Sequence, residues 1–251
     1  MRTLLARSAI LIYLAALSTT EITAQPLTLE LETGPVWQSR NSAEVPNDGT
    51  ATRFSLTNLT GNGSFFPVGR AYLTWHVSDG QELRLLYAPL SVRGVGPSVG
   101  TLRFAGETFG ARDLLEGTYT FNSYRASYRW RTISNPGFTG WLGFTAKVRD
   151  ATIALTDGAT SSRKDDLGFV PLLHLAGTWT PSEFWSFGFD ADGLAGGPGR
   201  AVDGAVRVTF APNKQWALRF GYRTVEGGAD VDEVYTFAWL HYAVASIAVR
   251  F

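Results

Sequence analysis

Residues Tyr235 to Phe251, YTFAWLHYAVASIAVRF, decide the fold of this chain. Alternate residues, starting from Tyr235, are apolar except for His241, whereas the residues between them include polar and charged side chains. This alternation is typical of a β-strand with one face in an apolar environment. The strand is far longer than the roughly five or six residues usual in soluble proteins. A strand that crosses a bilayer needs about 9–11 residues for the apolar layer alone, so the stretch predicts a membrane-crossing strand.

A long alternating strand that ends on Phe251 resembles the C-terminal strand of bacterial outer-membrane β-barrels. The resemblance implies an all-β chain folded as a transmembrane, antiparallel, up-and-down barrel in the outer membrane. It also implies two partners, the lipid bilayer and the barrel-assembly machinery that recognises such a strand. It implies no specific subfamily, oligomeric state or activity.

The N-terminus has the three parts of a secretory signal peptide. Arg2 and Arg7 precede the apolar run Ser8–Leu17, and a polar stretch with a small residue, Ala24, follows. The apolar run is too short for a membrane-spanning helix, which needs about 20 residues. We therefore predict that residues 1–24 are a cleaved signal peptide and that residues 25–251 form one barrel domain.

The composition excludes several classes of protein. No long apolar segment follows residue 24, which excludes a helical membrane protein but not a barrel. The 22 basic and 22 acidic residues leave no net charge, so nucleic acid is not an expected partner. There is no cysteine for a disulfide or a thiol site. No metal or other cofactor is expected, because Asp190 and Asp192 lack the remaining ligands of a calcium loop.

Alternating segments along the chain predict ten strands. Short turns suited to hairpins are expected at 79–80, 134–137, 181–183 and 212–214. Longer connections are expected at about 41–67, 94–117, 157–167, 195–201 and 226–234. With the first strand, Leu27 to about Arg40, beside the last, the chain would close into a barrel with short turns at one end and longer loops at the other.

Residues 53–59 and 101–109 also have the character of strands. If both crossed the membrane, the barrel would have twelve strands, and short turns would no longer gather at one end. Ten strands are therefore preferred, with these two segments either extending above the rim or folded into the lumen.

Tryptophans gather near the four short turns. Such a concentration at one level predicts an aromatic girdle at a membrane interface. The residues assigned to this girdle are Trp75, Trp130, Trp141, Trp179, Trp185, Trp216 and the terminal Phe251.

The inward face predicted by the alternation is rich in charge. Its basic residues are Arg70, Arg84, Arg125, Arg129, Arg131, Lys147, Arg149, Arg207, Arg219 and Arg223, and its acidic residues are Glu30, Glu32, Glu82, Asp190, Asp192 and Asp203. Ion pairs between neighbouring strands would hold the wall without any ligand. The surplus of basic residues would instead favour small anions in the lumen.

Catalytic patterns of outer-membrane enzymes are only partly present. Proteases of the omptin type carry one Asp-x-Asp and one Asp-x-His pair near the outer rim. Asp190-Ala-Asp192 resembles the first pair, but no histidine stands two residues after an aspartate. Lipid A deacylases use outward-facing His, Ser and Glu, and His241 has no such companions. No Ser-His pair of a phospholipase is visible.

The sequence therefore favours a non-enzymatic outer-membrane barrel. Its role would be structural, or that of a narrow, porin-like pore with a basic lumen for small anionic solutes. A hydrolase that acts on lipid or peptide at the outer rim is the alternative from a different class. A third interpretation, a subunit or adhesin, places the function in loops 41–67 and 94–117.

Overall fold

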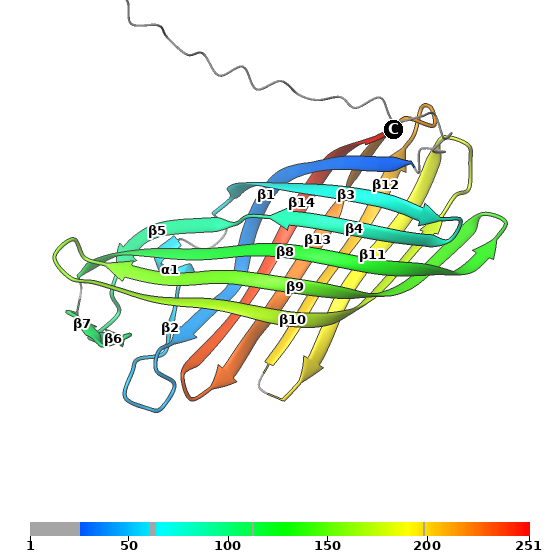
Figure 1. Cartoon of the computed structure of the whole chain (residues 1–251). Coiled ribbons are helices and arrows are strands. Elements are labelled where there is room, and N and C mark those ends of the chain that lie inside the picture. The colour runs from blue at the N-terminus through cyan, green and yellow to red at the C-terminus, as the bar shows by residue number, and fades with distance from the viewer. Residues whose placement is uncertain (1–25, 61–63, 112, 198) are drawn as a thin grey trace, which may run out of the picture.

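Ten antiparallel strands close into a barrel in the computed structural model, which describes residues 26–60, 64–111, 113–197 and 199–251 (Figure 1). The strands are β1 (Leu27–Glu44), β3 (Phe66–Ser78), β4 (Gln81–Ala88), β8 (Leu114–Asn135), β9 (Phe138–Thr156), β10 (Ser161–Trp179), β11 (Trp185–Gly196), β12 (Gly199–Phe210), β13 (Trp216–Val231) and β14 (Val234–Arg250). Neighbours in this order pair with one another, and β14 pairs with β1. The predicted ten-strand closure is confirmed. The predicted signal peptide lies outside the described residues.

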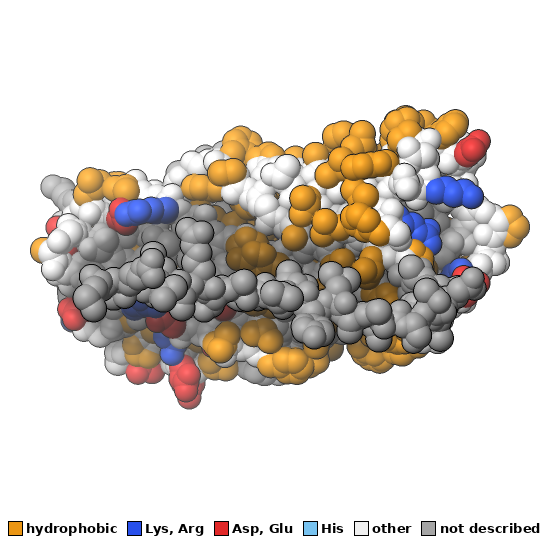
Figure 2. Space-filling model, turned by 45° about the horizontal axis from the view of Figure 1, so that its top comes forward, with side chains coloured by type: hydrophobic (Ala, Val, Ile, Leu, Met, Phe, Trp, Pro, Cys, Tyr) orange, Lys and Arg blue, Asp and Glu red, His pale blue; other side chains and the backbone are white. Residues whose placement is uncertain are grey.

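The alternation of side chains follows the prediction. On β14, Trp239 and Ile247 point outward and are 45% and 40% exposed, whereas Leu240 and Tyr242 point inward and are 1% and 4% exposed. Apolar side chains cover much of the wall in Figure 2, and charged side chains gather towards its two ends. His241 points outward as expected and pairs with Trp37, and the irregularity in pairing comes one residue further along β1, between Gln38 and Arg40.

Several connections are tighter than predicted, because the strands run further. Only residues 157–160, 197–198 and 232–233 separate the strands where loops 157–167, 195–201 and 226–234 were expected. Glycine permits the first two of these turns: Gly158 has a φ of 93° and Gly197 a φ of 44°. We call this side of the barrel the loop end, because it also carries the two long connections after β1 and β4. The opposite side is the short-turn end.

The barrel wall splits towards the loop end. One edge of β10 pairs with β9 along its whole length. The opposite edge pairs with β11 only over Leu173–Trp179, and from Ser161 to Leu172 no described strand pairs with it. The group β8–β9–β10 therefore leans away from the group β11–β14, as Figure 1 shows. A second gap lies on the other side of the barrel. β4 and then β5 (Ser91–Pro97) pair with β8, but only β4 also pairs with β3.

The segment 54–60 fills the interior beside this second gap. β2 (Phe54–Ser55) pairs with β1, and the single turn α1 (Thr57–Thr60) packs on β5. Leu56 and Leu59 are buried against a core of inward-facing residues that includes Leu155 and Leu240. Of the two interpretations offered for this segment, folding into the lumen is the correct one.

The segment 101–109 forms a small hairpin of β6 (Leu102–Phe104) and β7 (Glu107–Phe109). Phe104 and Phe109 are fully buried, and the Phe104 ring meets Phe54 edge-on at 5.5 Å. The hairpin thus covers the inserted segment and adds no strand to the barrel. No described helix has the length and apolar character needed to cross a membrane.

Replacing Gly94 on β5 with alanine tests the packing of α1. A Cβ at Gly94 would lie 2.2 Å from the Thr60 Cα and 2.7 Å from the Leu59 carbonyl oxygen. Because both neighbours are backbone atoms, Gly94→Ala should displace α1 and lower the free energy of unfolding by about 1–3 kcal/mol. Denaturant titration of the barrel in lipid vesicles measures this loss.

Gly204→Ala is the matched control, since a Cβ there meets nothing within 4 Å. Its stability should stay within about 0.5 kcal/mol of the parent. Equal stability of the two variants would contradict the close approach of α1 to β5.

Candidate functional site

Charged side chains from opposite walls meet in the middle of the barrel. The six predicted acidic residues of the lumen are only 2% to 7% exposed. Four of the predicted basic residues are as deeply buried: Arg70, Arg84, Arg125 and Arg223 are 1% to 6% exposed. Buried ions are tolerated only when they are paired and hydrogen-bonded, so these groups must satisfy one another.

Asp203 on β12 is the centre of this arrangement. Its carboxylate accepts hydrogen bonds from Arg223 at 2.5 Å and from Arg70 at 3.2 Å, and it pairs with Arg125 at 2.7 Å. Arg70 lies on β3 and Arg125 on β8, each four strands away from β12 around the barrel. These ion pairs therefore cross the lumen.

Further pairs extend the arrangement towards the short-turn end. Arg84 on β4 donates to Asp190 on β11 at 2.5 Å, and Arg207 donates to Glu30 at 3.1 Å. Arg219 also donates to Glu30. We call these linked residues the central network; its members are Glu30, Glu32, Arg70, Tyr72, Arg84, Arg125, Asp190, Asp192, Asp203, Arg207, Arg219 and Arg223.

Tyr72 shows how closely the central network is packed. Its hydroxyl donates to Glu32 at 3.2 Å and accepts from Arg223 at 2.9 Å. Its ring lies 4.3 Å from the guanidinium carbon of Arg84, in the geometry of a cation–π contact. The aromatic ring fills space between the charged groups, so the network is a packed layer.

Four of the predicted basic residues lie outside this layer. Arg129 pairs with Glu82 at 2.5 Å towards the short-turn end. Arg131 is exposed at that rim and donates to the carbonyl oxygen of Asp79, so its assignment to the lumen is wrong. Its position two residues beyond Arg129 carries it past the end of the barrel interior. Lys147 and Arg149 face inward on the loop-end side of the network.

The predicted girdle residues mostly point outward. Trp75, Trp130, Trp179, Trp185 and Trp216 are 40% to 53% exposed, and Phe251 is 73% exposed. Trp141 does not belong with them, because its neighbour Leu142 occupies the outward position and Trp141 turns inward. The guanidinium of Arg129 lies 4.9 Å from its ring. Closeness to a turn suggested the girdle assignment, but the alternation of β9 decides the direction.

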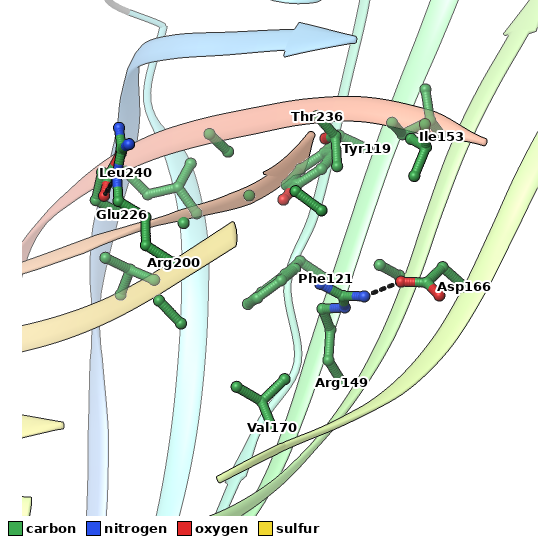
Figure 3. Close-up of a pocket in the computed structure, with 18 of the residues that line it drawn as sticks. Tyr119, Phe121, Arg149, Ile153, Asp166, Val170, Arg200, Glu226, Thr236 and Leu240 are labelled. Carbon is green, nitrogen blue, oxygen red and sulfur yellow. Dashed lines mark hydrogen bonds and ion pairs between the residues drawn. The ribbon is translucent and has the colours of Figure 1, made fainter. Parts of the chain in front are cut away.

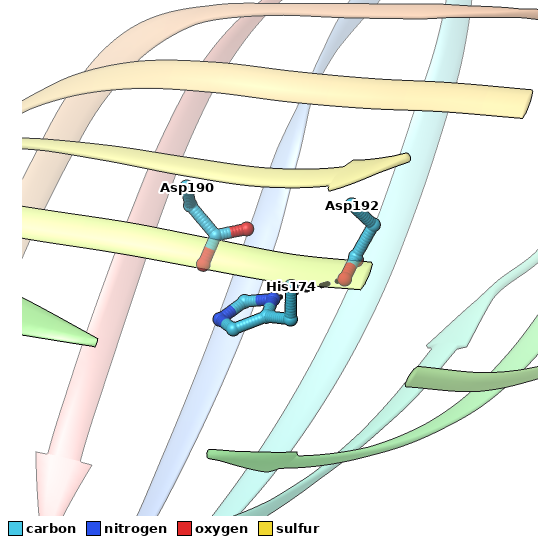
Figure 4. A group of neighbouring side chains, drawn as sticks. All are labelled: His174, Asp190 and Asp192. Atoms are coloured by element: carbon cyan, nitrogen blue, oxygen red, sulfur yellow. Dashed lines mark hydrogen bonds and ion pairs between the residues drawn. The ribbon is translucent and has the colours of Figure 1, made fainter. Parts of the chain in front are cut away.

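His174 is a buried residue that the sequence pattern did not single out, because both faces of its strand look apolar. Its Nδ1 lies 2.9 Å from Asp192, and Asp190 is the third member of the group (Figure 4). Arg84 and Arg125 already neutralise the two carboxylates. A divalent cation would have to displace both guanidinium groups, so this donor set does not fit a metal.

The same group lacks the parts of a hydrolytic site. The Nε2 of His174 has no hydrogen-bond partner among the described residues, so no nucleophile is aligned with it. Asp190 and Asp192 are each 6% exposed. A peptide or lipid has no access to such deeply buried carboxylates.

A cavity lies above the central network, between the two diverging groups of strands (Figure 3). We call it the loop-end cavity. Its apolar lining includes Tyr119, Phe121, Ile153, Val170, Val225 and Leu240. Its charged lining comprises Lys147, Arg149, Lys164, Asp166, Arg200 and Glu226.

Two ion pairs account for part of this charge. Arg149 pairs with Asp166, the contact drawn in Figure 3, and Arg200 pairs with Glu226 at 2.7 Å. Lys147 and Lys164 form no ion pair with any described residue. The loop-end cavity therefore carries an excess of positive charge beside an apolar lining.

A second cavity lies below the central network, at the short-turn end. Glu30, Arg84 and Trp141 are part of its lining, together with Ala176 and Thr178. Residues of the central network thus form part of the wall of this second cavity, whereas Lys147 and Arg149 face the loop-end cavity. The central network lies between these two cavities, and a smaller pocket beside Arg70 and Arg125 adjoins the network itself.

Comparisons with known proteins agree with the fold. Neither protein-family models nor curated protein sequences match this chain. Its structure is similar to that of the outer membrane protease OmpT from Escherichia coli, with a TM-score of 0.54 and 11% sequence identity over 91% of this chain and 98% of that one. At such identity the likeness concerns the fold alone.

Two further solved structures are more distant. Neisserial surface protein A has a TM-score of 0.37 and 12% identity over 90% of this chain and 97% of its own. The attachment invasion locus protein Ail of Yersinia pestis has a TM-score of 0.36 and 10% identity over 90% and 99% of the two chains.

Removing the carboxylate of Asp203 tests the central network. Asp203→Asn leaves three guanidinium groups without their shared anion, so the free energy of unfolding should fall by about 3–5 kcal/mol. Asp165→Asn is the control, because Asp165 pairs with Arg163 on the surface. Denaturant titration should show almost no change in this control, and a similarly mild effect of Asp203→Asn would contradict the network.

Proposed function

We propose that this chain is an integral outer-membrane β-barrel whose lumen is closed to solutes and whose activity resides at its loop end. The observation that carries the proposal is the central network. Ion pairs between β3, β8 and β12 cross the lumen and leave separate cavities on either side. The inserted segment 54–60 adds a second barrier in the loop-end half.

Insertion in a membrane is supported by the outward face. Large apolar side chains stand exposed along the wall, among them Leu142 at 50%, Phe144 at 59% and Phe220 at 56%. Where its ten strands pair all the way round, towards the short-turn end, the barrel also satisfies their backbone groups without water. We assign Trp75, Trp130, Trp179, Trp185, Trp216 and Phe251 to a girdle at the interface near the short turns.

The short-turn end is assigned to the periplasm and the loop end to the exterior, as is usual for outer-membrane barrels. In this scheme, residues 1–24 act as a cleaved signal peptide, and the assembly machinery recognises β14 with its terminal Phe251. The two long connections, between β1 and β3 and between β4 and β8, then face outward from the cell.

The two other functions suggested by the sequence find less support. A narrow anion pore requires a continuous path, whereas most of the basic residues are bound to carboxylates within the lumen. An omptin-like hydrolase requires an accessible acidic pair and an Asp-x-His pair. Asp190 and Asp192 are buried and held by arginines, and the second pair is absent from the sequence.

Replacing Phe220 with arginine tests insertion in the membrane. Phe220 is 56% exposed on the outward face of β13, four residues beyond Trp216 of the girdle. Arginine at this depth in the apolar layer should lower the free energy of unfolding in a bilayer by about 2–4 kcal/mol. Val99→Arg is the control, because Val99 is 91% exposed but lies in the long connection after β5. Titration in vesicles should show no significant loss for Val99→Arg. Two equally stable variants would argue that Phe220 faces water.

Planar-bilayer recording tests the closed lumen. The wild-type barrel should show no steady conductance. Arg125→Ala/Asp203→Ala should open a path, because these groups span the lumen and the gap beside β10 lets ions bypass segment 54–60. Heat-dependent migration on gels identifies the variants that are folded. Steady wild-type currents, as large as those of the double variant, would contradict the proposal and favour a pore.

A further inference from the structure

Lys147 is a buried cation that lacks a counterion among the described residues. Its side chain faces inward on β9, the residue is 4% exposed, and Nζ lies 4.7 Å from the centre of the Phe121 ring. No described carboxylate lies within 4.0 Å of its nitrogen, and no described group forms a hydrogen bond with it. A charge in such surroundings is costly unless it is compensated.

The neighbours of Lys147 increase this imbalance. Arg125 is its direct partner across the β8–β9 ladder, and like charges in opposite positions repel one another. Arg125 is already bound to Asp192 and Asp203, so neither carboxylate is left for the lysine alone. Two residues along β9, Arg149 pairs with Asp166 through Nη2, but its buried Nε has no hydrogen-bond partner.

Both unsatisfied groups belong to residues that line the loop-end cavity. The rings of Tyr119 and Phe121 and the side chains of Val225 and Leu240 line the same space. The complement of such a site is an anionic head joined to an apolar body. The cavity volume is about 80 Å³. Since one water occupies about 10–15 Å³ of such space, the enclosed cavity holds the head and the first carbons of a ligand, and the rest of a longer apolar chain must lie outside it.

The split in the wall gives such a ligand a route of entry. The cavity is lined by Lys164 and Val170 of β10 on one side and by Arg200 of β12 on the other. Between these strands, the edge of β10 from Ser161 to Leu172 has no described strand partner. Leu167 and Phe169 on this edge are 75% and 68% exposed.

We propose that the loop-end cavity binds a small amphiphilic carboxylate, whose head pairs with Lys147 and the Nε of Arg149 and whose apolar body packs on Tyr119 and Phe121. The carboxylate supplies the acceptor oxygens that both cationic groups lack. This site is distinct from the central network, and its occupancy does not require a closed lumen.

Titration of the full-length barrel in lipid nanodiscs with octanoate labelled with ¹³C at the carboxyl carbon tests the proposal. Empty nanodiscs give the contribution of lipid partitioning. The wild type should show saturable binding of one octanoate, and octanamide, which has the same length but no charge, should bind at least about tenfold more weakly.

Lys147→Met removes the charge while keeping a similar shape, and it should weaken octanoate binding by at least about tenfold. Lys147→Arg should retain most of the affinity. Lys214→Met, in a turn at the opposite end of the barrel, is the matched control and should bind as the wild type does. Heat-dependent migration on gels shows that each variant is folded.

Three outcomes would overturn the proposal. These are an absence of saturable octanoate binding to the wild type, equal binding of octanoate and octanamide, or equal affinities of the wild type and a folded Lys147→Met. If Lys147→Met instead fails to fold, octanoate binding to the wild type is measured at increasing chloride concentrations. A charge-paired head should be displaced by the salt, and binding that is insensitive to salt would reject the pairing. Conductance tests the closed lumen independently of all these results.

Discussion

The convergence of three guanidinium groups on Asp203 is the interaction on which the rest of the structure depends. A carboxylate buried in a barrel is stable only when cations compensate it, and here the cations come from β3, β8 and β13. β13 is the neighbour of β12, whereas β3 and β8 lie across the lumen from it, so the ion pairs of Arg70 and Arg125 with Asp203 fix the distance between opposite walls. The pairs also join the group β8–β10 to the group β11–β14 just where the backbone pairing between β10 and β11 ends. Towards the short turns, backbone hydrogen bonds between β10 and β11 hold the two groups of strands together. Where those bonds end, ion pairs across the lumen connect the two groups.

The interior of the barrel has a different lining on each side of the central network. Towards the short turns, the lining is polar and includes Glu30 and Arg219. Towards the loops, it becomes a packed apolar core, in which Leu56 and Leu59 of the inserted segment meet Leu240. The inserted segment closes the gap beside β5, whereas the gap beside β10 stays open and leads to a cavity. In our proposal the molecule is therefore sealed along its axis but accessible from one side of its loop end.

Period-two alternation was sufficient to predict the wall. It gave the ten strands and the facing of almost every charged residue, because the side chains of a strand must alternate between two environments. Trp141 was misplaced when closeness to a turn was preferred to this alternation. The partners across the lumen could not be predicted, since they depend on the tilt and stagger of the strands and not on sequence order. The apolar lining near the loops with the uncompensated Lys147, and the place of His174 beside Asp192 in the central network, likewise emerged only when opposite walls were brought together.

The absence of cysteine from the chain allows the most direct test of a divided lumen. Ala151→Cys places a thiol in the loop-end cavity, and Thr178→Cys places one in the cavity at the short turns. A membrane-impermeant thiol reagent is added to intact cells, and labelling is repeated after the envelope is opened. A closed lumen predicts rapid external labelling of Ala151→Cys and labelling of Thr178→Cys only after opening. Equally rapid external labelling of both variants would contradict it.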